Sequence, residues 1–597
     1  MPTIHRARVL ALFLVASATL LSGGRSWGQL PTSYDLWAVT TLSGTVAWVS
    51  AIQNQGTAED CWTFASATAM DSNLLMQGLL ATGSVAPAPE VSSWHLSTAN
   101  GNPNQIDPAK AFKTGPSNWG GFEYLALGYV TRGAGQWTIP GNHDPSQEVT
   151  LFGGGPVSNA ANPANVFPAS ISNYTGDDAL FTPNPITPLL PPVNQPTAWR
   201  VTNVTILDQG FSNNVALPSQ SGTVTIGSGS NATDYLTYSF TLGAADPQVQ
   251  AVKSAILSSG AVTTSMNSQG NFIAVSNQGV GPALNTIEYQ NPYAAPGNSD
   301  HEVTIIGWDD TKQITAGGTT TTGAWLVQNS WGTSFYTNTP VNYSDGTFWA
   351  AYDDAVIGRS GVASFQLASM EGWSQTVLQN ELGPMAYADN FDVVAGAAYD
   401  KPEWVGSPTG MATVDASSVM SILTPDTSGV LAGLGMATQV GGVDVLASIY
   451  DWNATTQTFG TLLGQSTFTD ESIGFFLGTI DPITLLGGHS YAVVLDYSQN
   501  GSPLANAAGV TIGGSGLNGY LHVSAGLSYY QPLGTNQWVD MNTLEFTSSS
   551  TDNSQGGVLF LKGYLSSVPE LDPSGLAGAV TAALGALALV ESRRRSR

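Results

Sequence analysis

The sequence has little cysteine and little positive charge. Cys61 is the only cysteine among 597 residues, so no disulfide can form within the chain. Lysine and arginine together number 16, against 42 aspartates and glutamates, and the formal net charge is −26. A surface this acidic repels phosphate backbones and anionic lipids. Nucleic acid is therefore excluded as an expected partner.

The rest of the composition is that of a large globular protein. Hydrophobic residues make up 42% of the chain and charged residues only 10%, and the length predicts two or more domains. Residues 1–28 have the architecture of a secretory signal peptide, because Arg6 and Arg8 precede an apolar run over 9–21. We expect the protein to be exported. In an oxidising compartment a single thiol invites unwanted coupling, so its presence indicates a chemical role.

The residues around Cys61 predict that its thiol lies at the start of a helix. Asp60 is a favoured N-cap residue, and the stretch WTFASATAMDSNLLM after Cys61 spaces small and apolar side chains as a helix does. The N-terminal end of a helix favours a thiolate through its N–H groups and its dipole. Glu59 and Asp60 oppose that ionisation, because they place two carboxylates beside the thiol. A lone cysteine can also be a small buried hydrophobe, and this alternative stays open.

Gln55 lies six residues before Cys61 in a glycine-containing loop. Its side-chain amide can join the backbone N–H of Cys61 in stabilising an oxyanion. The stretch QGTAEDCWTF resembles the active-site segment of the papain-like cysteine peptidases, in which Gln-Gly is followed by Cys-Gly-Ser-Cys-Trp. It departs from that segment at Ala58, where family members usually have a disulfide-forming cysteine, and at Glu59 and Asp60, which replace Gly-Ser.

Two later segments supply a candidate base and its partner. His301 precedes an apolar run over 303–308 in SDHEVTIIGWDD, and Asn329 and Trp331 follow a short predicted strand in AWLVQNSWGTSF. These segments resemble the Asp-His-Ala-Val and Lys-Asn-Ser-Trp-Gly motifs of the same family. The resemblance implies that His301 takes the proton of the Cys61 thiol and later protonates the leaving amine. It also implies that Asn329 orients the imidazole and that Trp331 shelters it from water.

A glycine pair is the candidate substrate contact. Gly120 and Gly121 lie in NWGGFEYLALGYV, which resembles the Asn-x-Gly-Gly stretch that lines the cleft in this family. Backbone without side chains can lie against an extended peptide and pair with it as a strand does. The alternative is an ordinary turn. The resemblance implies a protein or peptide substrate and no metal or organic cofactor.

The peptidase-like pattern covers residues 30–360 and contains an insertion. Residues 140–247 are rich in Pro, Asn, Gly, Ser and Thr, with strand-like patches at 199–207 and 235–242. We expect this insertion to rim the substrate cleft. For the domain as a whole, the resemblance implies an α+β fold with the two lobes of papain-like enzymes.

Residues 364–565 have a different pattern. Short apolar runs such as 443–450 and 491–497 alternate with Gly, Asn, Asp and Ser turns, which predicts an all-β, antiparallel sandwich. The region resembles the lectin-like domain that follows the peptidase in some bacterial papain-like proteins. Binding to a glycan or to extracellular matrix is what this resemblance implies.

Residues 566–597 combine a Val-Pro-Glu signature, an apolar stretch at 575–590 and a terminal arginine cluster. This pattern resembles a PEP-CTERM sorting signal, whose family role is transient membrane retention followed by release to the cell surface or matrix. A plain C-terminal membrane anchor, with a transmembrane helix, is the alternative. We expect a cell-envelope or extracellular location, with membrane contact through this segment.

Together these segments predict a secreted cysteine endopeptidase with a Cys-His-Asn triad and a glutamine in the oxyanion hole. Two other functions fit the same residues. One is a surface adhesion or glycan-binding protein whose peptidase-like domain is catalytically silent, an alternative kept open by Glu59, Asp60 and the missing disulfide. The other is acyl transfer to an amine, as in transglutaminase-like enzymes.

Overall fold

The computed structural model describes residues 30–378 and 416–566, both with gaps that include 54, 56–60 and most positions from 81 to 198. The predicted signal peptide and C-terminal sorting segment lie outside the described residues, as do Glu59, Asp60, Gly120 and Gly121. Within the described ranges, no helix combines the length and the apolar character that crossing a membrane requires.

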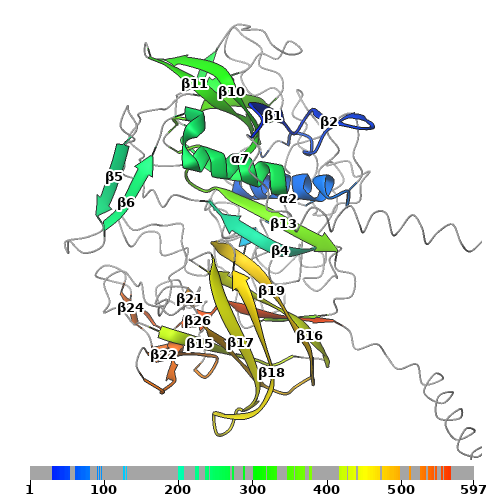
Figure 1. Ribbon diagram of the computed structural model, residues 1–597, viewed down its shortest axis with the longest axis vertical. Helices are drawn as coiled ribbons and strands as arrows, with labels where there is room; N and C mark the ends of the chain where they lie inside the picture. The colour runs from blue at the N-terminus through cyan, green and yellow to red at the C-terminus, as the bar shows by residue number, and fades with distance from the viewer. Residues whose placement is uncertain are drawn as a thin grey trace, which may run out of the picture.

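A seven-stranded sheet forms the first large element of the fold (Figure 1). Its strand order is β1-β10-β11-β12-β9-β8, with β7 pairing to β10. The strands are β1 (Ser33–Asp35), β7 (Val262–Met266), β8 (Phe272–Ala274), β9 (Ile287–Tyr289), β10 (His301–Ala316), β11 (Thr319–Gln328) and β12 (Thr347–Ala351). β10 and β11 are antiparallel, with Thr304 opposite Gln328. The start of β10 and the end of β11 therefore meet at one edge of the sheet.

Helix α2 (Cys61–Met76) begins at Cys61, as the sequence predicted. All of its residues except Met76 are buried, because other elements pack around it on several sides. Its Asn73 side chain illustrates this, since Nδ2 donates to Ser259 O at 2.9 Å and Oδ1 accepts from Leu367 N at 2.9 Å. These partners lie 186 and 294 residues away in the chain. The helix that starts with the thiol is thus held by long-range contacts.

Helix α7 (Pro247–Ser259) packs beside α2. Asp246 caps its start by accepting from Gln248 N at 2.8 Å, and proline occupies its first position. The helix stops at Gly260, whose φ of 92° favours glycine. A Cβ at Gly260 would lie 2.6 Å from Ser72 Oγ, so this glycine also allows α7 to approach α2 closely.

A six-stranded sheet in the order β13-β4-β19-β16-β27-β14 links the peptidase-like region to the C-terminal region. Its strands are β4 (Trp199–Ile206), β13 (Ala363–Ser369), β14 (Gln375–Leu378), β16 (Gly429–Thr438), β19 (Gly474–Leu485) and β27 (Leu561–Ser566). β4 belongs to the predicted insertion, yet it pairs with β13 on one side and with β19 on the other. This part of the insertion has a structural role that the sequence did not indicate.

A second six-stranded sheet, in the order β18-β17-β20-β15-β22-β23, completes the C-terminal region. Its strands are β15 (Ala416–Leu423), β17 (Val443–Asn453), β18 (Thr458–Asp470), β20 (Tyr491–Asp496), β22 (Ser528–Pro532) and β23 (Val539–Asp540). The pairs within it are antiparallel. The predicted runs at 443–450 and 491–497 correspond to β17 and β20.

The described chain also contains smaller elements. Four two-stranded pairs join β2 (Val39–Thr41) to β3 (Gly44–Val46), β5 (Gly222–Gly227) to β6 (Tyr235–Phe240), β21 (Val510–Ile512) to β26 (Gly557–Leu559), and β24 (Glu545–Thr547) to β25 (Asn553–Gln555). Two short 3-10 helices cover Gly243–Ala245 and Met541–Thr543. The described chain is mostly β, and the two-lobed arrangement stays a prediction.

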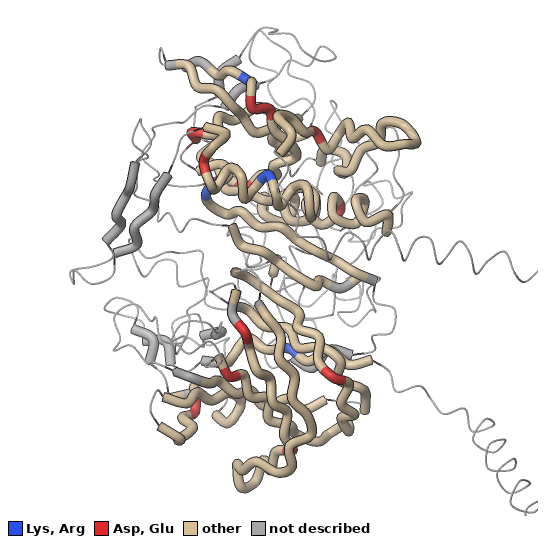
Figure 2. Tube along the Cα trace, in the orientation of Figure 1, with Lys and Arg blue, Asp and Glu red and all other residues tan. Residues whose placement is uncertain are grey.

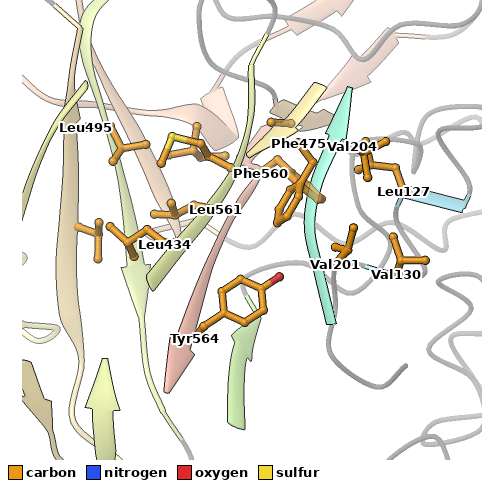
Figure 3. Packing of buried hydrophobic residues seen from close by; sticks show 14 of the residues in the cluster. Leu127, Val130, Val201, Val204, Leu434, Phe475, Leu495, Phe560, Leu561 and Tyr564 are labelled. Carbon is orange, nitrogen blue, oxygen red and sulfur yellow. The ribbon is translucent and has the colours of Figure 1, made fainter. Parts of the chain in front are cut away.

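One apolar cluster continues from α2 into the sandwich. Trp62 and Leu74 of α2 belong to the same cluster as Val204 of β4, Phe475 of β19 and Leu495 of β20. Figure 3 shows the middle of this cluster, where β4 lies between Leu127 and Val130 on one side and the sandwich strands on the other. The two regions therefore share a core.

Candidate active site

The start of α2 lies at the end of β10 that begins with His301. Thr304 Oγ1 donates to Ala65 O in the second turn of α2, at 3.2 Å. Two turns further along the helix, Ser72 Oγ accepts from Ala261 N at 2.9 Å, and Ala261 immediately precedes β7, whose first residue lies opposite Ile305. α2 therefore runs in the same direction as β10. Its first residue, Cys61, is directed toward the sheet edge that carries His301.

His301 and Asn329 form a hydrogen-bonded pair. Nε2 of His301 lies 2.8 Å from Oδ1 of Asn329. Because a carboxamide oxygen only accepts, Nε2 carries the proton and Nδ1 keeps its lone pair. The ring of Trp331 stacks on the imidazole, with centroids 4.4 Å apart and planes 22° from parallel. The imidazole is thus held by a hydrogen bond at its edge and by an indole on its face.

Burial shifts the titration of His301. Its side chain is 7% exposed, and this desolvation lowers the pKa of His301 to about 4 from the ordinary 6.5. The hydrogen bond to Asn329 and the charge of Asp300 act in the opposite direction but are outweighed. At neutral pH the resting imidazole is therefore uncharged and able to accept a proton.

Ser330 connects Asn329 to Gln55. Its hydroxyl donates to Gln55 Oε1, its carbonyl accepts from Gln55 N at 2.7 Å, and its own N–H donates to Asn329 Oδ1 at 2.7 Å. The carboxamide oxygen of Gln55 thus faces Ser330, and its NH₂ group is the donor end of the amide. Sequence reasoning missed Ser330, although its place between Asn329 and Trp331 was a usable signal.

Cys61 is 8% exposed and is the first residue of α2. Its burial alone fits the small-hydrophobe alternative, whereas its position at a helix start on the His301 side of the sheet favours a nucleophile. The N–H groups of a first helical turn have no acceptors within the helix. The influence of Glu59 and Asp60 and the substrate contact of Gly120 and Gly121 stay predictions, because these residues lie outside the described ones.

The described residues contain no group of side chains that indicates a metal site. Among the described residues, no group of three or more His, Cys, Asp or Glu side chains is arranged to hold a metal ion. The described site residues are a thiol, an imidazole, two carboxamides, a hydroxyl and an indole. These groups are suited to nucleophilic and acid–base chemistry.

Comparisons with known proteins agree with this chemistry. Residues 220–349 match the model of the papain family cysteine proteases. The matched segment contains His301, Asn329, Ser330 and Trp331, and it begins after Cys61. No curated protein matches the sequence.

Two solved structures are similar over most of the chain. A clostridial cysteine protease, a cysteine-to-alanine variant of Cwp84 after propeptide cleavage, is 17% identical, with a TM-score of 0.51 over 87% of this chain and 97% of that one. The cysteine protease and lectin-like domains of Cwp84, a surface layer associated protein of Clostridium difficile, are 16% identical, with a TM-score of 0.51 over 92% of this chain and 91% of that one. At these identities the likeness establishes the fold, a papain-like domain followed by a lectin-like domain. With the family match over residues 220–349, it follows that the chain carries a cysteine-type peptidase domain.

Proposed function

We propose that this protein is an exported cysteine endopeptidase in which Cys61, His301 and Asn329 form the catalytic triad and Gln55 contributes to the oxyanion hole. The arrangement that carries the proposal is the bonded set at the edge of the seven-stranded sheet. His301 Nε2 is bound to Asn329 Oδ1 at 2.8 Å, and Ser330 binds both Asn329 and the oxygen of Gln55. These bonds fix the orientation of His301, Asn329 and the Gln55 carboxamide.

The proposed first step is proton transfer from the Cys61 thiol to Nδ1 of His301. Burial lowers the pKa of His301 and so disfavours its charged form, and we propose that the transfer accompanies attack on the substrate carbonyl. The sulfur–carbon bond forms while the carbonyl π electrons move to oxygen. Nε2 keeps its hydrogen bond to Asn329, so the imidazolium stays in place.

The oxyanion is the next charge to be stabilised. Gln55 Nε2 and the backbone N–H of Cys61 are the proposed donors, as the sequence suggested. Collapse of the tetrahedral intermediate transfers the Nδ1 proton of His301 to the leaving amine and leaves an acyl group on Cys61. A water molecule, deprotonated by the same imidazole, then hydrolyses the thioester and restores the thiol.

The substrate is proposed to be an extended protein or peptide segment that pairs with backbone at Gly120 and Gly121. The C-terminal sandwich is proposed to bind glycan or matrix, which the lectin-like domain of Cwp84 supports by its fold. Location at the cell envelope or outside the cell, with transient membrane retention through 575–590, is proposed from the two terminal segments. The surface-layer association of Cwp84 is consistent with it.

Cys61→Ala tests the function most directly. We expect peptide hydrolysis to fall by about 10⁴-fold or more, because the nucleophile is removed, while unfolding is little changed. New amino termini released from a protein substrate would be counted, and labelling by a thiol-directed epoxide would be followed in parallel. Hydrolysis at the wild-type rate by Cys61→Ala refutes the proposal. Labelling of wild type without new amino termini favours acyl transfer, and the absence of both favours a silent binding protein.

A further inference from the structure

A small pocket lined by polar and apolar residues adjoins Asn329. Its volume is about 10 Å³, close to the roughly 10–15 Å³ that one water molecule needs. The lining comes from four segments, which are the loop before α2, the first half of α2, the start of β10 and the end of β11. Four of the lining side chains carry the argument, and they are those of Gln53, Glu302, Gln328 and Asn329.

The orientation of Asn329 is fixed by the bonds of its oxygen. Oδ1 accepts from His301 Nε2 at 2.8 Å and from Ser330 N at 2.7 Å. The other end of the same amide, Nδ2, is buried and has no hydrogen-bond partner among the described residues. A buried donor left without an acceptor costs about 1–3 kcal/mol. An acceptor for Nδ2 is therefore expected in the pocket.

In Gln328 and Gln53 too, only one end of the side-chain amide has a hydrogen-bond partner among the described residues. Gln328 Nε2 donates to Ser50 O at 3.2 Å, and Gln53 Oε1 accepts from Ser93 Oγ at 3.5 Å. Gln328 Oε1 and Gln53 Nε2 are both buried without a hydrogen-bond partner in the described part of the chain. Besides the donor Asn329 Nδ2, the pocket therefore has one acceptor, Gln328 Oε1, and one further donor, Gln53 Nε2.

Glu302 supplies the fourth polar group. It follows His301 directly in β10, is 2% exposed and lines the same pocket. A carboxyl group offers acceptor lone pairs in either protonation state. It can therefore accept a hydrogen from a bridging group in addition to its other interactions.

We propose that one water molecule in this pocket joins Asn329 to Glu302, and that Glu302 is a positioning residue for the triad. The water accepts from Asn329 Nδ2 and Gln53 Nε2, and it donates to Gln328 Oε1 and the Glu302 carboxylate. These four bonds use its full capacity. Asn329 is then held at both ends of its amide, by His301 and Ser330 at the oxygen and by the water at the nitrogen. The catalytic consequence rests on the proposed function, whereas the water site does not.

Kinetics test the positioning role. Glu302→Ala removes the acceptor, so we expect kcat to fall about tenfold with KM unchanged, since a misplaced imidazole loses productive geometry. Glu302→Gln keeps an acceptor oxygen and is expected to retain most of kcat. In an Asn329→Ala background, Glu302→Ala is expected to cause no further loss, because its effect passes through Asn329. The same tenfold loss in both backgrounds would overturn the role.

A high-resolution crystal structure of the full chain tests the water site without reference to activity. We expect one ordered water within hydrogen-bond distance of Asn329 Nδ2 and the Glu302 carboxylate in the wild-type protein. A pocket closed by a side chain, or a water that does not contact Glu302, would overturn the proposal even if the variants fail to fold. If Cys61→Ala hydrolyses peptides like wild type, the proposed function fails while this structural result still stands.

Discussion

The interior around the seven-stranded sheet and the interior of the sandwich differ in their buried polar groups. Near the seven-stranded sheet, ion pairs join Lys253 to Asp310 and Arg359 to Asp246, and both cationic side chains are almost fully buried. In the sandwich, small hydroxyls account for most of the buried polar side chains that are described, such as Ser421. The sandwich also buries one cation, Lys562, which is 1% exposed.

This difference reflects what each region requires of its buried side chains. Hydrogen bonds and ion pairs fix orientation, whereas the hydrophobic effect is non-directional and scales with buried area. An active site needs side chains held in one orientation, and a scaffold needs mainly stability. Figure 2 adds that few Lys or Arg residues appear in the described chain. Lys253 and Arg359 are buried, each against a carboxylate, so neither adds positive charge to the surface.

The largest expected effect in the sandwich comes from Phe475→Ala. The ring is fully buried, packs edge-on to Phe560 at 6.1 Å, and covers Gly435, where an added Cβ would lie 2.5 Å from it. We expect the free energy of unfolding to fall by about 3–5 kcal/mol, measured by urea denaturation. Leu486→Ala is the matched control, because Leu486 is 51% exposed. Equal losses in the two variants would contradict the picture of an apolar sandwich core.

The next largest effect is expected in the peptidase-like region. There the buried side chain of His301 makes the free energy of unfolding depend on pH. The unfolded chain binds a proton on His301 at about pH 6.5 and the folded chain only at about pH 4. Between these pH values the unfolded state holds more protons than the folded state. The contribution of His301 to the free energy of unfolding is therefore complete above pH 6.5 and is lost as the pH falls toward 4. We expect the free energy of unfolding to fall by about 3 kcal/mol over this range.

This prediction is checked by urea denaturation at a series of pH values in the Cys61→Ala background, where no thiolate interacts with the ring. His301→Gln in the same background is the control, because an amide does not titrate. The difference between the two stability curves isolates His301 from the many carboxylates. A constant difference from pH 7 to pH 4 would show that the imidazole is not desolvated.

Gln55 comes next. Gln55→Ala is expected to lower kcat about a hundredfold, the usual effect of losing one oxyanion donor. Alkylation of Cys61 develops no oxyanion and should be much less affected. Ser330→Ala leaves the amide but removes the hydroxyl that orients it, so a smaller loss of kcat is expected. Equal losses in hydrolysis and alkylation would place Gln55 in a structural role.

The smallest effect concerns the two carboxylates before the thiol. Asp60→Ser keeps a favoured helix cap while removing one charge, and Glu59→Gln removes the other. Each charge is expected to change the free energy of thiolate formation by about 1 kcal/mol, so either substitution should lower the apparent pKa of Cys61. The pH dependence of the alkylation rate measures this. Unchanged profiles would mean that both carboxylates lie in solvent.

The sequence by itself determined the local chemistry. An N-cap residue followed by small and apolar side chains was enough to predict a helix starting at Cys61, which is confirmed. The motifs around His301 and Asn329 predicted a base and its partner, and the structure places them 2.8 Å apart. Alternating apolar runs predicted the strands of the sandwich. Such features depend on residues close in sequence, or on short motifs with one chemical use.

Only the tertiary structure decided which distant groups share an environment. Ser330 lies 275 residues from the Gln55 side chain that it binds, and β4 pairs with two strands that lie far from it in the sequence, β13 and β19. The low pKa of His301 arises from burial by elements that no local pattern specifies. Desolvation and contacts between residues distant in sequence arise only when the chain folds. A local sequence pattern therefore cannot predict them.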